Sequence, residues 1–477
     1  AHARSLETDS PRMNGGLSGV RARLEASPGH RSWVLWTCLA GCFATTFTVT
    51  ILGVSLRTIA QDLGSDVSTV AWVMTAPMLA QAVSAPLLGK LGDLHGHRRV
   101  YLTGFAAATL AAIATAYAWD ATSLIGLRTI GQLAGTATMP ASMAILFRVY
   151  EGRERVKAMG WMSVVIAGAP VMGLAVGGVL IEWIGWRPIF LIQGVLSAVA
   201  CAIALFVLSE TPRRPQISLD APGALVFALA AFALTFAVNR LPGWGLFDPR
   251  VLSAMIATPF LLGVFVRIER RAANPLLPLE VLAKRNFSLP LVIGFCLQFA
   301  YMGGFVISPL IMMGLFGLGQ ASTSLWTIAR PISLSAASPV GGQLGSRYGE
   351  RAMIVAGSTL VFLAMGSFAL GAALEALAPI VGGLVLAGLG MGLAQPSLTT
   401  IVASDVTRED HGIAVSSMST ATGIGAVAGV SILTALCADV GTATSYRDGY
   451  LLGAVVAALG IVAGFALRNI DHDAVTA

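Results

Sequence analysis

Long apolar runs follow one another along this chain, and short polar stretches separate them. A transmembrane helix needs about 20 consecutive, mainly apolar residues, and runs of that length recur from residue 32 to residue 467. The pattern therefore predicts fourteen membrane-spanning helices. Their expected ranges are 32–56, 70–91, 100–119, 122–148, 158–182, 189–208, 220–239, 251–266, 287–315, 323–344, 352–374, 379–402, 413–437 and 450–467.

The composition supports a membrane protein. Of the 477 residues, 56% are hydrophobic and only 11% are charged, whereas a soluble domain usually carries about 25% charged residues. The five cysteines all fall inside apolar runs, so we expect neither a disulfide framework nor a metal site. We therefore expect an all-α polytopic membrane protein without a cofactor.

The positive charges indicate an orientation. If both termini are cytoplasmic, 23 of the 30 Lys and Arg residues fall on the cytoplasmic side, as the positive-inside rule requires. This asymmetry also explains the net charge of +6 without a nucleic-acid partner. The exceptions are Arg57, Arg187, Arg240, Arg250 and Arg447 in outer loops, and Arg128 and Arg330 within helices.

One glycine-rich stretch occurs twice. PLLGKLGDLHGHRR starts at Pro86, PVGGQLGSRYGER starts at Pro339, and each joins an even-numbered helix to the next. A shift of 253 residues aligns Gly89 with Gly342, Leu91 with Leu344, Gly92 with Gly345, Gly96 with Gly349 and Arg98 with Arg351. Six helices thus occur twice around a two-helix insert, an arrangement that recurs among transporters.

The repeat divides the chain into five segments. We expect a disordered cytoplasmic tail, an N-terminal six-helix bundle, a two-helix insert with cytoplasmic linkers, a C-terminal six-helix bundle and a second cytoplasmic tail. The corresponding ranges are 1–31, 32–208, 209–286, 287–468 and 469–477.

Several motifs resemble those of one family, the major facilitator superfamily. GKLGDLHGHRR resembles its signature between helices 2 and 3, LRTIGQLAG its helix 4 signature, and AGAPVMGLAVGG followed by GWRPIF its antiporter signature of helix 5. SLDAPGALVFAL, which opens the seventh helix, is typical of the fourteen-helix drug:proton antiporter branch. From residue 32 to 468 the chain resembles that branch, which implies the major facilitator fold.

The resemblance also implies a gate. In the family the loop acid, here Asp93, faces a helix of the other half and locks the halves together on the cytoplasmic side. A carboxylate is favoured beside a helix N-terminus, and glycines permit the tight turn. The second copy has Ser346 in place of the acid, so we expect a weaker lock there. The predicted lock residues are Gly89, Gly92, Asp93, Gly96, Arg98, Gly342, Gly349 and Arg351.

The fifth helix carries small residues at a spacing of four. Ala169, Gly173 and Gly177, with Gly178 beside them, form a smooth ridge that lets helices approach closely. Pro170 predicts a bend. The ridge is either static packing or a hinge and seal.

The chain departs from the branch in its charges. Where most members carry an Asp in the first helix, this chain has Thr48. Proton-driven transporters need an ionisable group in the path, and every acid here lies in a tail, in a loop or at the end of a predicted span. If protons are coupled, Glu182 and Asp93 are the candidates.

The embedded charges are instead positive, and a buried arginine needs acceptors. Arg128 and Arg330 are either satisfied by protein carbonyls or turned toward an anionic substrate group. The residues we expect to line the cavity or to couple transport are Thr48, Arg57, Arg128, Gln132, Arg330, Gln298, Tyr301 and Gln395.

These observations favour a secondary active transporter that exports amphiphilic small molecules by alternating access, as a monomer in the plasma membrane. The expected partners are a small amphiphilic substrate, membrane lipids and possible coupling protons. A lipid or anionic-metabolite carrier that is not proton-driven is the alternative within transport. A non-transporting sensor or scaffold is the alternative of another class. No nucleophile–base pair, metal spacing or phosphate-binding loop predicts an enzyme.

Overall fold

The computed structural model describes residues 27, 29–150, 152–211, 221–245, 247–272, 284–404, 411–438 and 442–468. Within these ranges the regular structure is helical. The predicted tails, 1–31 and 469–477, lie almost wholly outside the described residues.

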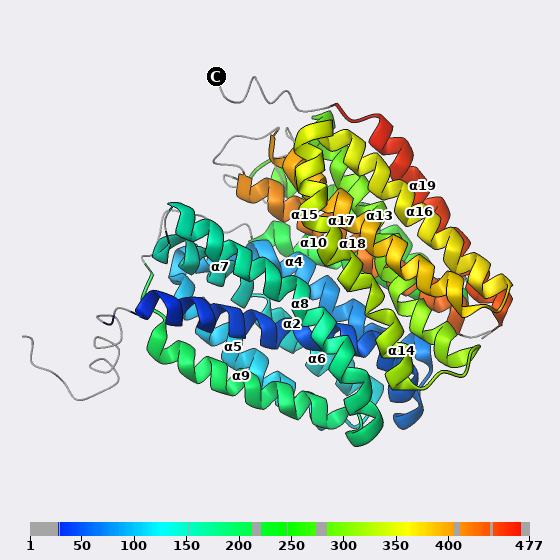
Figure 1. The fold of residues 1–477 in the computed structure, drawn as a ribbon, viewed down its shortest axis with the longest axis horizontal. Helices are drawn as coiled ribbons and strands as arrows, with labels where there is room; N and C mark the ends of the chain where they lie inside the picture. Colours follow the sequence, from blue (N-terminus) through cyan, green and yellow to red (C-terminus); the bar gives the residue numbers. More distant parts are fainter. Residues whose placement is uncertain are drawn as a thin grey trace, which may run out of the picture.

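The first half forms eight helices, coloured blue to green in Figure 1. They are α2 (His30–Asp62), α3 (Val67–Val70), α4 (Trp72–His95), α5 (His97–Ala116), α6 (Ala121–Gly135), α7 (Thr138–Val149), α8 (Gly152–Ile184) and α9 (Arg187–Val207). The insert forms α10 (Ala221–Trp244) and α11 (Pro249–Glu269).

The second half follows, coloured green to red in Figure 1. Its helices are α13 (Arg285–Gly314), α14 (Gln320–Thr327), α15 (Ala329–Tyr348), α16 (Glu350–Ala373), α17 (Leu377–Ser404), α18 (His411–Ala438) and α19 (Ala443–Phe465). Each of the fourteen predicted ranges is thus covered by one helix or by two consecutive ones.

Two of the helix breaks lie close to prolines. α6 gives way to α7 shortly before Pro140, and α14 gives way to α15 directly before Pro331. Proline has no backbone N–H and clashes with the preceding turn, so it interrupts the helical hydrogen-bond ladder. The sequence predicted one span at each place, and at the first of them residues Ala121–Val149 still form a single stretch that is long and apolar enough to cross a membrane.

Among the described residues, ten helices are long and apolar enough to cross a membrane. The helices at the other four predicted places, α4, α8, α10 and α15, do not meet that criterion over their described residues. The predicted count of fourteen crossings therefore stays a prediction, whereas a multi-pass helical membrane protein is established.

The two copies of the glycine-rich stretch fold alike. α4 and α5 are joined by Gly96 alone, at φ 94° and ψ 129°, and α15 and α16 by Gly349 alone, at φ 90° and ψ 142°. This left-handed region is accessible to glycine and strained for other residues. The repeat thus has a conformational basis at one position in each half.

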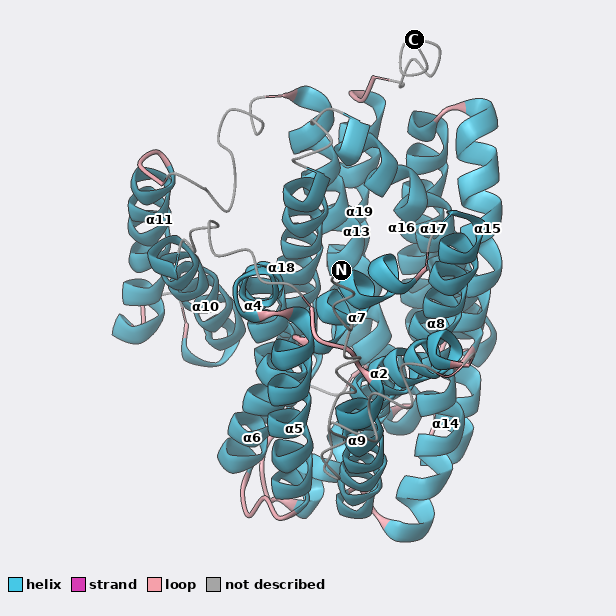
Figure 2. Cartoon of the chain, turned by 90° about the vertical axis from the view of Figure 1, so that its left-hand side faces the viewer, coloured by secondary structure: helices cyan, strands magenta, loops and turns pink. Residues whose placement is uncertain are grey.

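The helices form two bundles that meet along a seam (Figure 1). α2 packs against α8 and α9 in the first bundle, and α13 packs against α18 and α19 in the second. Across the seam α4 packs on α18, and α14 packs on α8. Figure 2 shows the insert helices at one side, where α10 contacts both α4 and α18.

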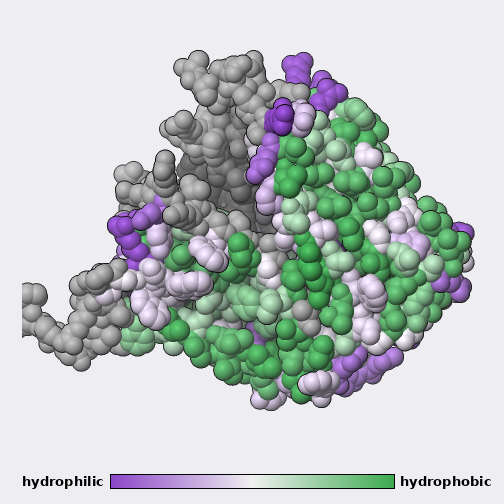
Figure 3. Space-filling model, viewed as in Figure 1, coloured by the Kyte–Doolittle hydropathy of each residue, from purple (hydrophilic) through white to green (hydrophobic). Residues whose placement is uncertain are grey.

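Apolar side chains cover most of the described part of the face seen in Figure 3, and polar ones gather toward its edges. On α11, Met255, Ile256 and Phe260 are also exposed. Contiguous exposed apolar surface of this extent is rare on soluble monomers. It fits helices that face lipid tails.

Candidate functional site

We name the two ends of the molecule by residues that lie there. The Glu182 end holds the carboxyl termini of α2 and α8 and the start of α14, and the Arg98 end holds the α4–α5 and α15–α16 turns.

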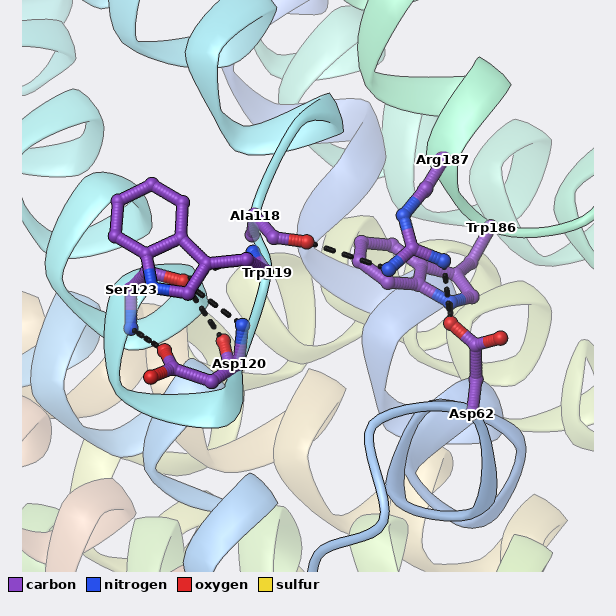
Figure 4. A network of polar contacts seen from close by, with 7 residues as sticks. All are labelled: Asp62, Ala118, Trp119, Asp120, Ser123, Trp186 and Arg187. Atoms are coloured by element: carbon purple, nitrogen blue, oxygen red, sulfur yellow. Dashed lines mark hydrogen bonds and ion pairs between the residues drawn. The ribbon is translucent and has the colours of Figure 1, made fainter.

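At the Glu182 end a polar cluster ties the first bundle together (Figure 4). Asp62 of α2 accepts hydrogen bonds from the Trp186 indole, at 3.0 Å, and from Arg187 Nη1 at the start of α9. Arg187 Nη2 donates to the carbonyl of Ala118 at 3.2 Å. We call Asp62, Ala118, Trp186 and Arg187 the clamp, because they join α2, α9 and the end of α5.

Beside the clamp, Asp120 caps α6. Its carboxylate accepts a hydrogen bond from the Ser123 backbone N–H at 2.6 Å, and Ser123 Oγ accepts one from the Asp120 backbone N–H at 3.2 Å. The backbone hydrogen bond from Ser123 lowers the pKa of the Asp120 carboxyl. Such a capping box satisfies N–H groups that the helix leaves open.

The contacts between the halves at this end are of another kind. Glu182 Oε1 of α8 accepts the backbone N–H of Ala321 at 2.7 Å, so the carboxylate caps the first turn of α14 from the opposite half. Thr58 Oγ1 of α2 donates to Gln320 Oε1 at 3.0 Å. These two hydrogen bonds cross the seam without an ion pair.

The small-residue ridge of α8 explains how closely the halves approach there. A Cβ on Gly178 would clash with the Ser324 side chain and lie 3.0 Å from the Gln320 carbonyl oxygen. Gly177 faces Ile51 of its own half, and Ala169 and Gly173 are buried. Pro170 has a side chain outside the described residues. The ridge is therefore packed on both sides, and Gly178 is the position that faces the opposite half.

Two further contacts cross the seam. A Cβ on Gly53 of α2 would lie 2.9 Å from Phe305 Cε1 of α13. Gly314 lies between Arg57 Nη1 and Tyr446 Oη, which a Cβ there would meet at 3.3 and 3.4 Å. The sequence placed Arg57 just beyond the first helix, but α2 extends to Asp62 and includes it.

Arg128 lies inside the first bundle. It is 6% exposed, its Nη2 donates to Thr48 Oγ1 at 3.3 Å, and its guanidinium lies 5.5 Å from the Phe190 ring centroid. The cavity beside it is lined by residues of α2, α5, α6 and α9. The sequence left open whether protein groups or a substrate satisfy Arg128, and every lining residue of this cavity belongs to one half.

Arg330 lies in the second bundle and is 3% exposed. Its Nη1 donates to the Tyr301 carbonyl at 3.2 Å, and its guanidinium lies 4.0 Å from the Tyr301 ring centroid and 3.7 Å from that of Phe305. Because Phe305 also contacts Gly53, Arg330 sits one side chain away from the opposite half. Among the described ion pairs, none includes Arg128 or Arg330.

The predicted glutamines have different surroundings. Gln132 Nε2 donates to Gln81 Oε1 at 3.3 Å. Gln298 of α13 and Gln395 of α17 each have a buried side-chain oxygen without a hydrogen-bond partner in the described part of the chain. Gln298 shares a helix face with Tyr301 and Phe305, which follow it three and seven residues on.

At the Arg98 end, the described hydrogen bonds of Arg98 go to the end of α9 and to the residues that directly follow it. Arg98 Nη1 pairs with Glu210 at 2.7 Å, its Nη2 donates to the Leu205 carbonyl at 2.9 Å, and its backbone N–H donates to Thr211 Oγ1 at 3.3 Å. The sequence did not predict this pairing, which joins α5 to the end of α9.

The remaining lock residues are placed only in part. Gly92 is buried, Gly342 is exposed and Arg351 is half-buried. Gly89 and the Asp93 side chain lie outside the described residues, although both fall within α4. The gating role of Asp93 stays a prediction.

Sequence reasoning missed three residues that matter here. Gln193 lines the Arg128 cavity, Phe305 bridges Arg330 to the other half, and Gln320 receives the hydrogen bond from Thr58. Only Gln193 carried a signal, as an amide inside an apolar run.

Comparison with known proteins identifies the class. The sequence profile described as Major Facilitator Superfamily matches residues 38–406 and, in a second match, 291–476. The first match alone covers more than half of the chain, which therefore belongs to this superfamily. It is a multi-pass membrane transporter rather than an enzyme.

Curated relatives include the tetracenomycin C resistance and export protein of Streptomyces glaucescens, 25% identical over 88% of this chain and 79% of that protein. The multidrug transporter protein MdtP of Bacillus subtilis is 26% identical over 90% of this chain and 78% of that protein. The riboflavin transporter RibZ of Clostridioides difficile is 24% identical over 82% of this chain and 85% of that protein.

Solved structures share the fold. The human organic anion transporter MFSD10 aligns with a TM-score of 0.60 at 16% identity, covering 92% of this chain and all of that one. The nucleoside transporter NupG aligns with a TM-score of 0.61 at 16% identity, covering 94% of this chain and 99% of that one.

Proposed function

We propose that this chain is a secondary active transporter of the fourteen-helix drug:proton antiporter branch, which exports amphiphilic small molecules from the cytoplasm by alternating access. The observation that carries the proposal is the seam at the Glu182 end, where α8 and α2 of one half contact α14 of the other through a glycine and two hydrogen bonds. Rocking of two bundles about such a seam exposes a central site to each side in turn.

Two kinds of relative support an export role. The Streptomyces relative bears the name of a resistance and export protein, and the Bacillus relative that of a multidrug transporter. With both termini cytoplasmic, as the positive charges indicate, the Glu182 end faces outward. The seam contacts then close the outer side, and the substrate enters from the cytoplasm or the inner leaflet.

The test is transport by the purified chain in proteoliposomes. A panel of fluorescent amphiphiles, one cationic, one zwitterionic and one anionic, is loaded and its release followed with and without an imposed pH gradient. We expect saturable movement of at least one member that stops when a bifunctional thiol reagent cross-links the halves through cysteines at the exposed positions Trp183 of α8 and Leu325 of α14. Movement of no probe, or movement indifferent to that cross-link, would overturn alternating access at this seam.

A second candidate is a carrier of anionic metabolites or lipids that is not driven by protons. Arg330 favours it, because its buried guanidinium forms no ion pair with any described residue and lies one aromatic ring from the seam. An anionic group that reached it would gain a charge-assisted hydrogen bond.

The variant Arg330→Met separates the two candidates. Methionine fills similar space without charge, and replacing buried charge by an apolar residue is often tolerated. If Arg330 binds an anion, the variant loses anion transport about tenfold or more while transport of the cationic probe is unchanged. An equal effect on both probes would exclude charge recognition by Arg330.

A further inference from the structure

The cavity beside Arg128 has an unusual lining for an apolar bundle. Arg128, Gln193, Thr45, Thr115 and Ser197 all contribute polar groups to it. Arg128 and Gln193 are each 6% exposed, so their polar atoms are removed from bulk water. Burying such groups costs free energy unless each finds a hydrogen-bond partner.

Two of these atoms have no hydrogen-bond partner within the described residues. One is Arg128 Nε, a donor, and the other is Gln193 Oε1, an acceptor. The orientation of the Gln193 amide is set by its other end, because Nε2 donates to the Ala44 carbonyl at 3.0 Å. Turning the amide over would set its oxygen against that carbonyl oxygen.

The threonine hydroxyls reinforce the acceptor character of the wall. Thr115 Oγ1 donates to the Ala111 carbonyl at 2.7 Å, and Thr45 Oγ1 donates to the carbonyls of Gly41 and Cys42, both at 3.1 Å. Because their hydrogens are engaged, these oxygens can offer only lone pairs to the cavity. The wall thus combines one charged donor with several acceptors.

The size of the cavity limits its occupant. The centre of a water-sized sphere can move within a volume of about 20 Å³, and one buried water needs about 10–15 Å³ by the same measure. The cavity therefore has room for one water molecule.

We propose that this cavity is a binding site for a single ordered water molecule, which accepts a hydrogen bond from Arg128 Nε and donates one to Gln193 Oε1. A small anion would satisfy Arg128 but face the oxygens of Gln193, Thr45 and Thr115. Water both accepts and donates hydrogen bonds, so it can satisfy the Arg128 donor and the Gln193 acceptor together. It links α6 to α9, and Thr48 links α6 to α2.

The role of Arg128 follows from this arrangement. Its guanidinium contacts Thr48, the bound water and the Phe190 ring, all inside the first bundle. Arg128 is then a positioning residue that holds α2, α6 and α9 together and does not contact the substrate, a conclusion that also rests on the proposed transport function.

The direct test is a density map of the whole protein at a resolution that shows ordered waters. We expect one peak within about 2.7–3.2 Å of both Arg128 Nε and Gln193 Oε1. A continuous absence of density there would overturn the proposal. A crystal grown in bromide gives the second outcome that would overturn it, an anomalous bromide peak at that position.

Stability measurements on detergent-solubilised variants give an independent test. Gln193→Met removes the amide at similar volume and should lower Tm by at least about 2 °C more than Gln132→Met, because the bound water loses its acceptor and the Ala44 carbonyl loses its donor. Gln132 is the matched control, since it lines the same cavity but bonds Gln81.

Rescue distinguishes hydrogen bonding from mere packing. Gln193→Glu keeps an acceptor for the bound water, and its protonated acid can donate to the Ala44 carbonyl as the amide does, so its Tm should exceed that of Gln193→Met, and its effect on transport KM should be the same for cationic and anionic probes. A Tm no higher than that of Gln193→Met would contradict the water-linked pair. A KM change confined to the anionic probe would contradict the positioning role.

Discussion

The clamp and the seam lie side by side at the Glu182 end and are built from different interactions. The clamp joins helices of one bundle through a carboxylate that binds both an arginine and an indole. The seam joins the two bundles through a glycine, a Thr58–Gln320 hydrogen bond and a carboxylate on a backbone N–H. An ion pair thus joins helices within one bundle, whereas the described contacts between the bundles are single hydrogen bonds and close packing at a glycine. Under the proposed alternating access the second set must part while the first stays formed.

The largest expected effect comes from a substitution that adds one carbon atom at the seam. Gly178→Ala places a Cβ against the Ser324 side chain and 3.0 Å from the Gln320 backbone oxygen. The halves cannot then close at this end, and we expect transport to fall about tenfold or more, which corresponds to a conformational shift of about 1.4 kcal/mol. The measurement is initial transport rate in proteoliposomes at matched protein amount.

The matched control lies on the same helix. A Cβ on Gly168 meets nothing within 4 Å, so Gly168→Ala should transport like the unmodified chain. Equal rates for both variants would show that the seam does not need its close approach.

The next effect weakens the clamp and spares the seam. Asp62→Ala removes the acceptor of Trp186 and Arg187 and should lower the free energy of unfolding by about 1–2 kcal/mol, while the transport rate per folded molecule is retained. Asp448→Ala, which removes an exposed pair with neighbouring Arg447, should change stability by less than about 0.5 kcal/mol. Denaturation in detergent compares the two, and equal losses would mean that the clamp adds nothing beyond a surface pair.

A smaller effect concerns the charge on the α14 cap. Glu182→Gln keeps an oxygen for the Ala321 N–H but removes the negative charge beside the helix N-terminus, worth about 0.3–1 kcal/mol. We expect the seam to open about two- to fivefold more often, measured as the rate at which an impermeant maleimide labels Ser324→Cys. Glu154→Gln at the Arg98 end is the control. An unchanged labelling rate in Glu182→Gln would show that the charge of Glu182 does not help to keep the seam closed.

The smallest effect is a pH dependence next to the clamp. The native pKa of Asp120 is lowered by the Ser123 backbone hydrogen bond, so its stabilisation is present above the unfolded pKa of about 3.9 and is lost as pH falls through the native pKa. Asp120→Asn still caps the helix but cannot titrate. Its Tm should match the unmodified chain near pH 7 and decline less below about pH 4; parallel curves would contradict this.

The sequence predicted the helices well because an apolar run of membrane length has few alternatives. The glycine repeat could also be recognised in the sequence, because Gly96 and Gly349 occupy a backbone conformation that other residues avoid. The breaks at Pro140 and Pro331 were missed because a proline inside an apolar run either bends or interrupts a helix, and the local sequence does not distinguish the two outcomes.

The site was far less predictable. An all-round apolar span does not show which face meets a partner, so the sequence left Arg128 open between protein acceptors and a substrate group, and only the structure shows that the cavity beside it is lined by one bundle. The seam depends on pairs distant in sequence, such as Thr58 with Gln320 and Gly178 with Ser324. The sequence around one member of such a pair does not indicate which residue is its partner.

The most direct test of the moving seam is a pair of spin-label distances in lipid nanodiscs. One pair, at the exposed positions Trp183 and Leu325, spans the Glu182 end, and the other, at the exposed positions Arg99 and Arg347, spans the Arg98 end. The account predicts that substrate or a pH step lengthens the first distance while it shortens the second. Two distances that stay fixed while the same preparation transports would contradict it.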